Sequence, residues 1–150
     1  MKTPRILERL PLASLALVVL SAGALAWTKS DDFVTGGGFI IPTASGAHAN
    51  FGVKGGVDVN GGFFGHLNYV DHSDPQLHVK STSITNYVVV NATTRQIEGT
   101  ATANGVPVTF TVTVSDAGEP GTSDTFAITL SSGYSASGTL QGGNIQLHVD

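Results

Sequence analysis

The sequence predicts an all-β fold, a single antiparallel barrel or sandwich of about nine to ten short strands. Segments in which apolar and polar residues alternate recur along the chain, and a period of two is typical of strands with one buried face. Glycine makes up 19 of the 150 residues, nearly twice its usual share of about 7%, which indicates many turns. No window of eleven residues after Trp27 shows the apolar spacing of a helix.

The first 26 residues are predicted to be a secretory signal peptide. Three basic residues come first, residues 10–26 are apolar apart from two serines, and the segment ends in Ala24-Leu25-Ala26. This order is typical of a signal peptide, with cleavage expected before Trp27. An uncleaved membrane anchor is the alternative, although the apolar run is at the short limit for a spanning helix. Residues 27–150 would then form one secreted domain.

Charge and cysteine content argue against several function classes. Three of the seven basic residues and one of the eleven acidic residues precede Trp27, which leaves four against ten and a net charge of −6 with histidine neutral. Nucleic acids and anionic membranes select clustered Lys and Arg, so neither is expected as a partner. The chain has no cysteine, which excludes disulfides and thiolate zinc sites. An exported domain without disulfides suggests a secreted or cell-surface protein of a bacterium.

Six strands are expected in the first part of the domain, each bounded by turn residues. Their predicted ranges are 33–41, 49–54, 62–71, 77–81, 84–90 and 95–103. Within the first of them, Gly36-Gly37-Gly38 indicates a bulge or a point of close backbone approach rather than a phosphate loop, because no helix follows it. Asn104-Gly105 ends this part with a strong signal for a two-residue hairpin turn.

The clearest strand is Val106–Ser115, in which apolar and polar residues alternate strictly. Its apolar face should line the core, and its threonine face should meet water. Three further strands follow, with hairpin turns expected at Gly133 and at Gly142-Gly143. The residues expected to point inward are Val106, Val108, Phe110, Val112, Val114, Phe126, Ile128, Leu130, Tyr134, Ala136, Leu140, Ile145, Leu147 and Val149.

An acidic loop over residues 116–124 joins two of these strands. Asp116, Glu119 and Asp124 could converge on a calcium ion, because calcium prefers carboxylate and carbonyl oxygens. The spacing is not that of an EF-hand. In the alternative interpretation the two aspartates cap backbone N–H groups, and Pro120-Gly121 makes a tight turn. The sequence leaves both interpretations open and makes calcium a possible cofactor.

Histidines suggest a second polar site. If residues 62–72 are extended, His66 and His72 share a face; His148 shares its face with Asn144. Imidazoles on neighbouring strands could meet at a transition-metal site, whereas surface histidines on a polar strand face are the simpler interpretation. The candidate residues of this second site are His66, Asp71, His72, His78, Asn144 and His148.

No catalytic motif is present. The chain lacks a nucleophile elbow, and no carboxylate pair among its acidic residues is singled out as a glycosidase pair. Abundant serine, histidine and aspartate do not constitute a triad, since a triad is defined by geometry. The sequence therefore favours a protein without enzymatic activity but does not exclude an enzyme.

Several segments together resemble a known module. They are residues 36–40, 50–53, 69–72, 116–124 and 142–148, of which the acidic Gly-Glu-Pro-Gly loop and the Gly-Gly-Asn segment are the most specific in combination. They resemble the post-choice-of-anchor domain, a small secreted bacterial β module that often closes large cell-surface proteins. The resemblance covers nearly all of residues 31–150 and implies no established activity. The family more commonly has Asn where this chain has Ala117. Because the module here follows a signal peptide directly, a free secreted protein is expected.

Three hypotheses for function follow. The first is a non-enzymatic extracellular binding or structural domain, which calcium could stabilise, with an unknown extracellular ligand or surface component as partner. The second is a small secreted hydrolase or isomerase that uses His66, His72 or His148 as acid or base in a barrel mouth. An apolar cavity with two converging histidines would favour it, and a filled barrel would oppose it. The third is a self-assembling matrix or filament subunit that pairs through exposed edge strands.

Overall fold

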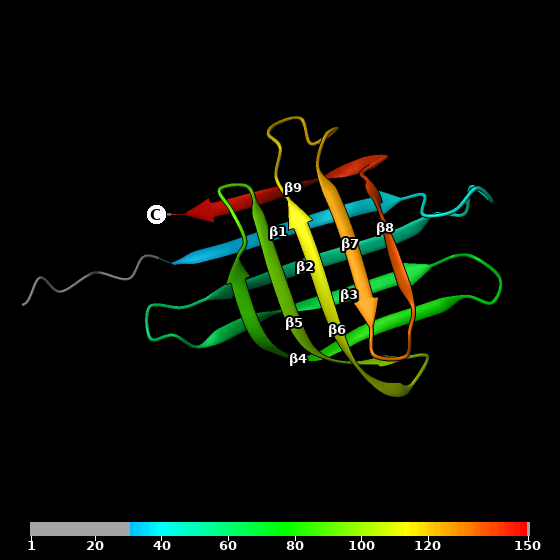
Figure 1. Cartoon of the computed structure of the whole chain (residues 1–150), viewed down its shortest axis with the longest axis horizontal. Helices are drawn as coiled ribbons and strands as arrows, with labels where there is room; N and C mark the ends of the chain where they lie inside the picture. Colours follow the sequence, from blue (N-terminus) through cyan, green and yellow to red (C-terminus); the bar gives the residue numbers. More distant parts are fainter. Residues whose placement is uncertain (1–30, 150) are drawn as a thin grey trace, which may run out of the picture.

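The computed structural model describes residues 31–149, which form one antiparallel sheet of nine strands without a helix (Figure 1). The predicted all-β class is confirmed, and the predicted signal peptide lies outside the described residues. Within residues 31–149 no helix is long and apolar enough to cross a membrane. The strands are β1 (Asp32–Ile40), β2 (Ala49–Val57), β3 (Phe63–Asp71), β4 (Leu77–Val89), β5 (Thr94–Ala103), β6 (Val106–Ser115), β7 (Thr125–Leu130), β8 (Ser135–Thr139) and β9 (Gly142–Val149).

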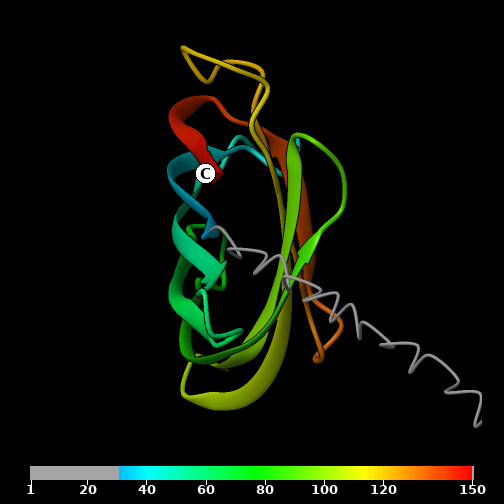
Figure 2. The same ribbon diagram turned by 90° about the vertical axis from the view of Figure 1, so that its left-hand side faces the viewer.

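The sheet curls into two layers that enclose the core. Its strand order is β8-β7-β6-β5-β4-β3-β2-β1-β9, and Figure 2 shows the layer of β9, β1, β2 and β3 facing the layer that contains β5 to β8. Strand β4 makes the corner: its first residues pair with β3, and residues 79–89 pair with β5. Register shifts at Ser81/Ser83 and Ile84/Asn86 bend this strand, as β-bulges do. The two strands predicted over 77–81 and 84–90 are therefore one.

The core consists of the inward residues of both layers, and the predicted alternation is confirmed over most of its length. Phe110, Val112 and Val114 of β6 are buried. So are Phe126, Ile128, Leu130, Leu140 and Ile145. The prediction is wrong for Val106 and Val149, which are 62% and 59% exposed. Both lie at strand ends, Val106 as the first residue of β6 and Val149 as the last of β9.

The last strand crosses the molecule instead of forming a hairpin with β8. Gly142-Gly143, predicted as a hairpin turn, opens β9, which pairs with β1 along its length. A Cβ at Gly38 would contact the carbonyl oxygen of Gly142, and one at Gly143 would contact that of Gly37. The close backbone approach predicted for Gly36-Gly37-Gly38 is thus confirmed, whereas β1 pairs in regular register without a bulge.

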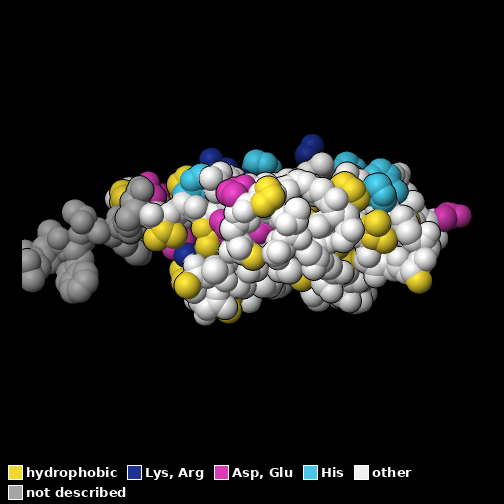
Figure 3. Space-filling view, turned by 90° about the horizontal axis from the view of Figure 1, so that it is seen from above, with side chains coloured by type: hydrophobic (Ala, Val, Ile, Leu, Met, Phe, Trp, Pro, Cys, Tyr) yellow, Lys and Arg dark blue, Asp and Glu magenta, His cyan; other side chains and the backbone are white. Residues whose placement is uncertain are grey.

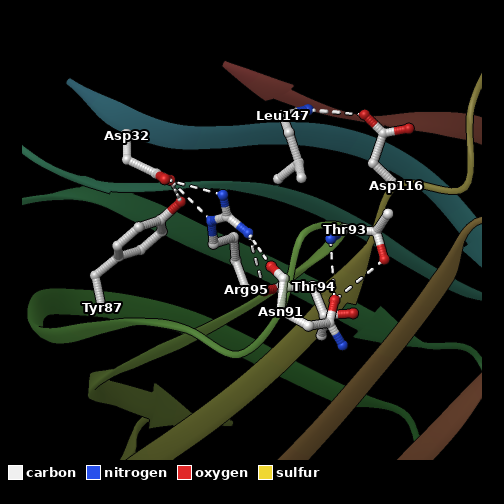
Figure 4. Close-up of polar contacts among 8 residues, drawn as sticks. All are labelled: Asp32, Tyr87, Asn91, Thr93, Thr94, Arg95, Asp116 and Leu147. Carbon is white, nitrogen blue, oxygen red and sulfur yellow. Dashed lines mark hydrogen bonds and ion pairs between the residues drawn. The ribbon is translucent and has the colours of Figure 1, made fainter. Parts of the chain in front are cut away.

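A buried ion pair ties β1 to the opposite layer. Arg95 is 3% exposed and donates to both carboxylate oxygens of Asp32 at 2.8 and 2.9 Å, and the Tyr87 hydroxyl donates to the same carboxylate at 2.6 Å (Figure 4). Burial opposes ionisation of Asp32, but the hydrogen bonds from Arg95 and Tyr87 outweigh it and hold the pKa of Asp32 below its usual value. This cluster keeps Arg95 inside the fold, where it is not available to a ligand.

A second polar cluster joins β3 to the segment before β8. The Tyr69 hydroxyl donates to Tyr134, and Tyr134 donates to Asp71, each over 2.6 Å. Burial raises the pKa of Tyr69 to about 12, and burial together with the bond to Asp71 raises the pKa of Tyr134. The chain Tyr69–Tyr134–Asp71 therefore stays in one protonation state at neutral pH and stabilises the contact between the layers.

Candidate functional site

The acidic loop lies against the outer edge of β9. Strand β9 pairs with β1 on one side only, so the amides on its other side need partners from elsewhere. The Asp124 carboxylate accepts the Ile145 N–H over 2.7 Å, and the Asp116 carboxylate accepts the Leu147 N–H over 2.9 Å (Figure 4 shows the second bond). The loop thus covers an edge that would otherwise be free to pair with another chain.

The remaining oxygens of these aspartates also accept backbone N–H groups. Asp116 accepts the Gly118 N–H over 2.9 Å, and Asp124, which is fully buried, accepts the Ala117 N–H over 2.8 Å. Glu119 accepts the side-chain amide of Asn144 over 2.9 Å. The three candidate calcium ligands are therefore all on the loop beside β9, and each carboxylate is hydrogen-bonded to protein N–H groups.

These contacts are the ones that the capping interpretation predicts. Within residues 31–149, no group of three His, Asp or Glu side chains has an arrangement suited to a metal ion. The predicted tight turn is present, with the Gly121 N–H bonded to the Gly118 carbonyl. Gly121 has φ 82° and packs against Asn144, so a side chain there would be strained. Calcium binding stays a prediction, which the melting experiment described below tests.

The histidines are placed together on one outer surface. Leu67, Tyr69 and Asp71 of β3 point inward, so the alternate residues, His66 among them, point outward. The same alternation turns His148 of β9 and His78 of β4 to that side. The His48 ring stacks on the outward ring of Phe39, and the backbone N–H of His72 donates to the backbone carbonyl of His48.

Both described lysines lie on this surface as well. In the strand register, Lys54 of β2 lies opposite His66 of β3, and Lys80 of β4 lies opposite Asn68 of β3. Figure 3 shows the Lys and His side chains gathered along one long side of the molecule, which is the outer face of the layer containing β9, β1, β2 and β3. We call the outer surface of β9, β1, β2, β3 and the start of β4 the basic face. Its basic side chains are Lys54, Lys80, His48, His66, His72, His78 and His148.

The candidate residues of the second polar site do not form one cluster. His66 and His78 border the same hollow, of about 540 Å³, together with Asn68 and Lys80. The His78 ring bonds to the Asn68 side-chain oxygen over 2.8 Å. His72 lies outside this hollow and bonds to Gln76 over 3.1 Å.

The other three candidates have separate roles. His148 stacks on Phe33 with ring centroids 4.3 Å apart and bonds to Thr35 over 3.1 Å. Asn144 bonds to Glu119 in the acidic loop. Asp71 points inward and accepts Tyr134, so it takes no part in the basic face.

A second hollow on the basic face was not expected from the sequence. It measures about 470 Å³, and its lining includes Gly52 at the floor and Phe39, Asn50 and Asn68 at the sides. Outward glycines leave it open: a Cβ at Gly52 would touch nothing within 4 Å. Because Asn68 lines both hollows, they adjoin and form one uneven surface across the strands. Period-two alternation could have indicated these outward glycines, given the correct pairing of β1, β2 and β3.

The basic face carries no acidic side chain at the outward strand positions. The outward residues of β1, β2 and β3 are aromatic, amide, basic or small, and none is Asp or Glu. The Lys54 ammonium lies 5.8 Å from the Phe33 ring centroid and 5.6 Å from that of Phe64, within reach of cation–π attraction. The one ion pair among residues 31–149 is Arg95–Asp32, so neither Lys54 nor Lys80 is neutralised by a carboxylate of that part of the chain.

In the part of the chain that the structure describes, the space between the two layers is filled by core side chains. Buried side chains of both layers form a single packed cluster between them, and His66 and His78 meet at an open hollow on the outside. The two histidines that lie together among the described residues are therefore on the outer surface and not between the layers.

No family model, curated protein or solved structure matches this chain. The resemblance to the post-choice-of-anchor domain therefore stays a prediction. Function has to be argued from the acidic loop, the basic face and the chemistry that each presents.

Proposed function

We propose that the chain is a non-enzymatic extracellular binding domain and that the basic face is its ligand-binding surface. One observation carries the proposal: Lys54 and Lys80 lie on the one face whose outward strand positions hold no carboxylate. Inside the fold, by contrast, charged side chains are paired with each other, as Arg95 is with Asp32. Charged groups that are left without a partner on one surface are the groups a ligand can use.

The surrounding side chains support recognition rather than catalysis. Asn50 and Asn68 offer amide donors and acceptors at the rim of the hollows, and Phe39 offers part of an aromatic ring. A binding surface needs such groups on a rigid support, and paired strands provide it. Apart from His48 and His72, which lie directly beside strand ends, the basic residues of the face are on paired strands, so these strands set its shape.

The test compares binding by four proteins to a panel of immobilised polymers: a neutral polysaccharide, acidic polysaccharides, a fibrous protein and single-stranded DNA. The first variant, Lys54→Gln/Lys80→Gln, removes two positive charges from the basic face. Its control, Thr125→Glu/Thr129→Glu, changes net charge by the same amount at exposed positions of β7 in the other layer. The fourth protein, Asn50→Ala/Asn68→Ala, removes the amides.

We expect at least one polymer to bind the wild type and the β7 control alike and to bind the lysine variant at least fivefold more weakly, with a smaller loss for the amide variant. The proposal would be wrong if no polymer bound, or if the lysine variant bound as tightly as the control.

A further inference from the structure

We infer that the ligand of the basic face is an acidic polysaccharide, bearing carboxylate or sulfate groups, and that binding strengthens as the pH falls below neutral. This inference rests on the proposed function, since it names the ligand class for the same surface. Four features of the basic face support it: its charge, its hydrogen-bonding groups, its shape and its histidines.

Charge complementarity indicates an anionic ligand. Lys54 and Lys80 have no carboxylate partner among the described residues, and the outward positions of β1, β2 and β3 include no acid. An approaching anion therefore meets two positive charges without displacing an internal ion pair. A cationic ligand would meet no opposite charge at the outward positions of these strands, because Asp32 and Asp71 point inward.

The neutral groups of the face suit a sugar polymer. Asn50 and Asn68 at the hollow can each donate to and accept from hydroxyl groups. Phe39 lines the same hollow, and Phe33 lies further along β1; both residues are part-exposed. Their rings present apolar surface that can pack against the C–H groups of a sugar ring. A nucleic acid would instead select clustered arginines and a dense row of phosphate contacts, and the only described arginine, Arg95, is buried in its pair with Asp32.

The shape of the face suits an extended chain. The two hollows, of about 470 and 540 Å³, adjoin at Asn68 and run across neighbouring strands. Five strands spaced about 4.8 Å apart give a surface roughly 19 Å wide. A polymer that crosses it can contact Phe39 and Asn50 at one end and Lys80 and His78 at the other.

The histidines make the positive charge depend on pH. As a residue type, histidine changes its charge near neutral pH, and five histidines lie on the same face as the two lysines, with His66 opposite Lys54 in the strand register and both His66 and His78 beside Lys80. The charged groups that face them are Lys54 on β2 and Lys80 on β4. Carboxylates at the margins of the face are Asp31 directly before β1, Asp58 and Asp74 in the connections beside β3, the buried Asp71 next to His72, and Glu119 beside Asn144 at the start of β9. Acidification therefore adds positive charge to the basic face while the anion keeps its own.

The experiment uses one sugar backbone in three forms, namely dextran, carboxymethyl-dextran and dextran sulfate, with single-stranded DNA as a fourth probe. Dissociation constants are measured by calorimetry at pH 7.5 and 5.5 and at two salt concentrations. The proteins are the wild type, Lys54→Gln/Lys80→Gln, His66→Gln/His78→Gln, the amide variant Asn50→Ala/Asn68→Ala and the Thr125→Glu/Thr129→Glu control. Melting curves at both pH values show that each protein is folded.

We expect carboxymethyl-dextran or dextran sulfate to bind the wild type at least tenfold more tightly than dextran, and the two acidic polymers identify which anion is preferred. Binding should tighten roughly tenfold from pH 7.5 to 5.5 and weaken with salt, as counterion release requires. The lysine variant should bind more weakly at both pH values, whereas the histidine variant should lose much of the pH dependence.

Two outcomes would overturn the inference while leaving the proposed function intact. In the first, dextran binds the wild type as tightly as its acidic forms do, and the amide variant Asn50→Ala/Asn68→Ala binds dextran more weakly than the wild type. In the second, single-stranded DNA binds more tightly than either acidic polymer through the lysines. If no probe binds, and the panel above also yields no ligand, both the inference and the proposed function are wrong.

Discussion

The acidic loop and the basic face use charge in opposite ways. In the loop, Asp116 and Asp124 accept four backbone N–H groups between them, two of which belong to β9. On the basic face, Lys54 and Lys80 are without a carboxylate partner in residues 31–149. The two loop carboxylates thus stabilise the fold through hydrogen bonds, whereas the two lysine ammonium groups remain available to a ligand. The negative net charge of the chain therefore says little about its ligand, because much of the negative charge is already bonded within the protein.

Removing one loop carboxylate is expected to have the largest effect on stability. Asp124→Asn keeps the size of the side chain but leaves an amide NH₂ facing a backbone N–H in a fully buried position. We expect a loss of about 2–4 kcal/mol in the free energy of unfolding, because a charged hydrogen bond is lost and a buried N–H is left without a partner. Urea unfolding at pH 7 measures it.

The matched control is Asp74→Asn, the same chemical change at an exposed aspartate in the connection between β3 and β4. It should change stability by less than about 0.5 kcal/mol. Equal losses at Asp124 and Asp74 would contradict the structural role of the loop.

The second prediction concerns pH and the Tyr69–Tyr134–Asp71 cluster. Burial disfavours the charged form of Asp71, but hydrogen bonds from Ser73 and Tyr134 outweigh it and lower its pKa. A lowered folded pKa contributes stability that is present above the unfolded value, near 3.8, and is lost as the pH falls through the folded value. The domain should thus remain stable at pH 5.5 and lose stability below about pH 4.

Tyr134→Phe removes the donor to Asp71 and isolates this contribution. We expect a loss of about 1–3 kcal/mol at pH 7, and the difference from the wild type should shrink below pH 4, where Asp71 becomes protonated. Urea unfolding across pH 2–7 measures both effects. A difference that grew toward low pH would show that the sign of the Asp71 contribution is wrong.

A small effect is expected on the basic face. Lys54→Gln/Lys80→Gln removes charges that have no partner in residues 31–149, so the free energy of unfolding should change by less than about 0.5 kcal/mol at pH 7. The same urea series measures it. A loss as large as that of Asp124→Asn would mean that the lysines stabilise the fold and are not free for a ligand.

The smallest expected effect is that of calcium on the melting temperature. Because the four oxygens of Asp116 and Asp124 already accept N–H groups, we expect the melting temperature to be the same in millimolar calcium and in excess chelator. A bound ion would instead add stability, by about 2.7 kcal/mol at a hundredfold excess over its Kd. A calcium-dependent rise that Asp124→Asn abolishes would favour the metal interpretation, and elemental analysis would detect an ion held too tightly to remove.

The fold could be predicted from the sequence wherever local pattern determines it. Val106–Ser115 was expected as a strand over the residues that form β6, and Asn104-Gly105 makes the predicted turn, with φ values of 47° and 82°. Alternation shows which side of a strand is apolar, but it does not show which strand lies beside it. For this reason the local pattern predicts a turn at Gly142-Gly143, although these residues begin a strand that pairs with β1.

The candidate site was less predictable because it depends on contacts between distant segments. The acidic loop was identified, but its aspartates could equally bind an ion or N–H groups until the amides of Ile145 and Leu147 were placed beside them. The outward position of His66 and His148 followed from alternation. Their relation to Lys54 and Lys80 required the order of five strands, which no local pattern contains.

The most direct test of this division of charge is an amide NMR titration of the wild-type protein with a carboxymethyl-dextran oligosaccharide at pH 5.5. We expect shift changes at Lys54, His66, Asn68 and Lys80 and across the paired positions of β1 and β9. We also expect the Ile145 and Leu147 amides to stay protected from exchange by Asp124 and Asp116. Shift changes confined to residues 116–124 or to the layer of β5 to β8 would contradict the central claim that carboxylates hold the fold and the basic face binds the ligand.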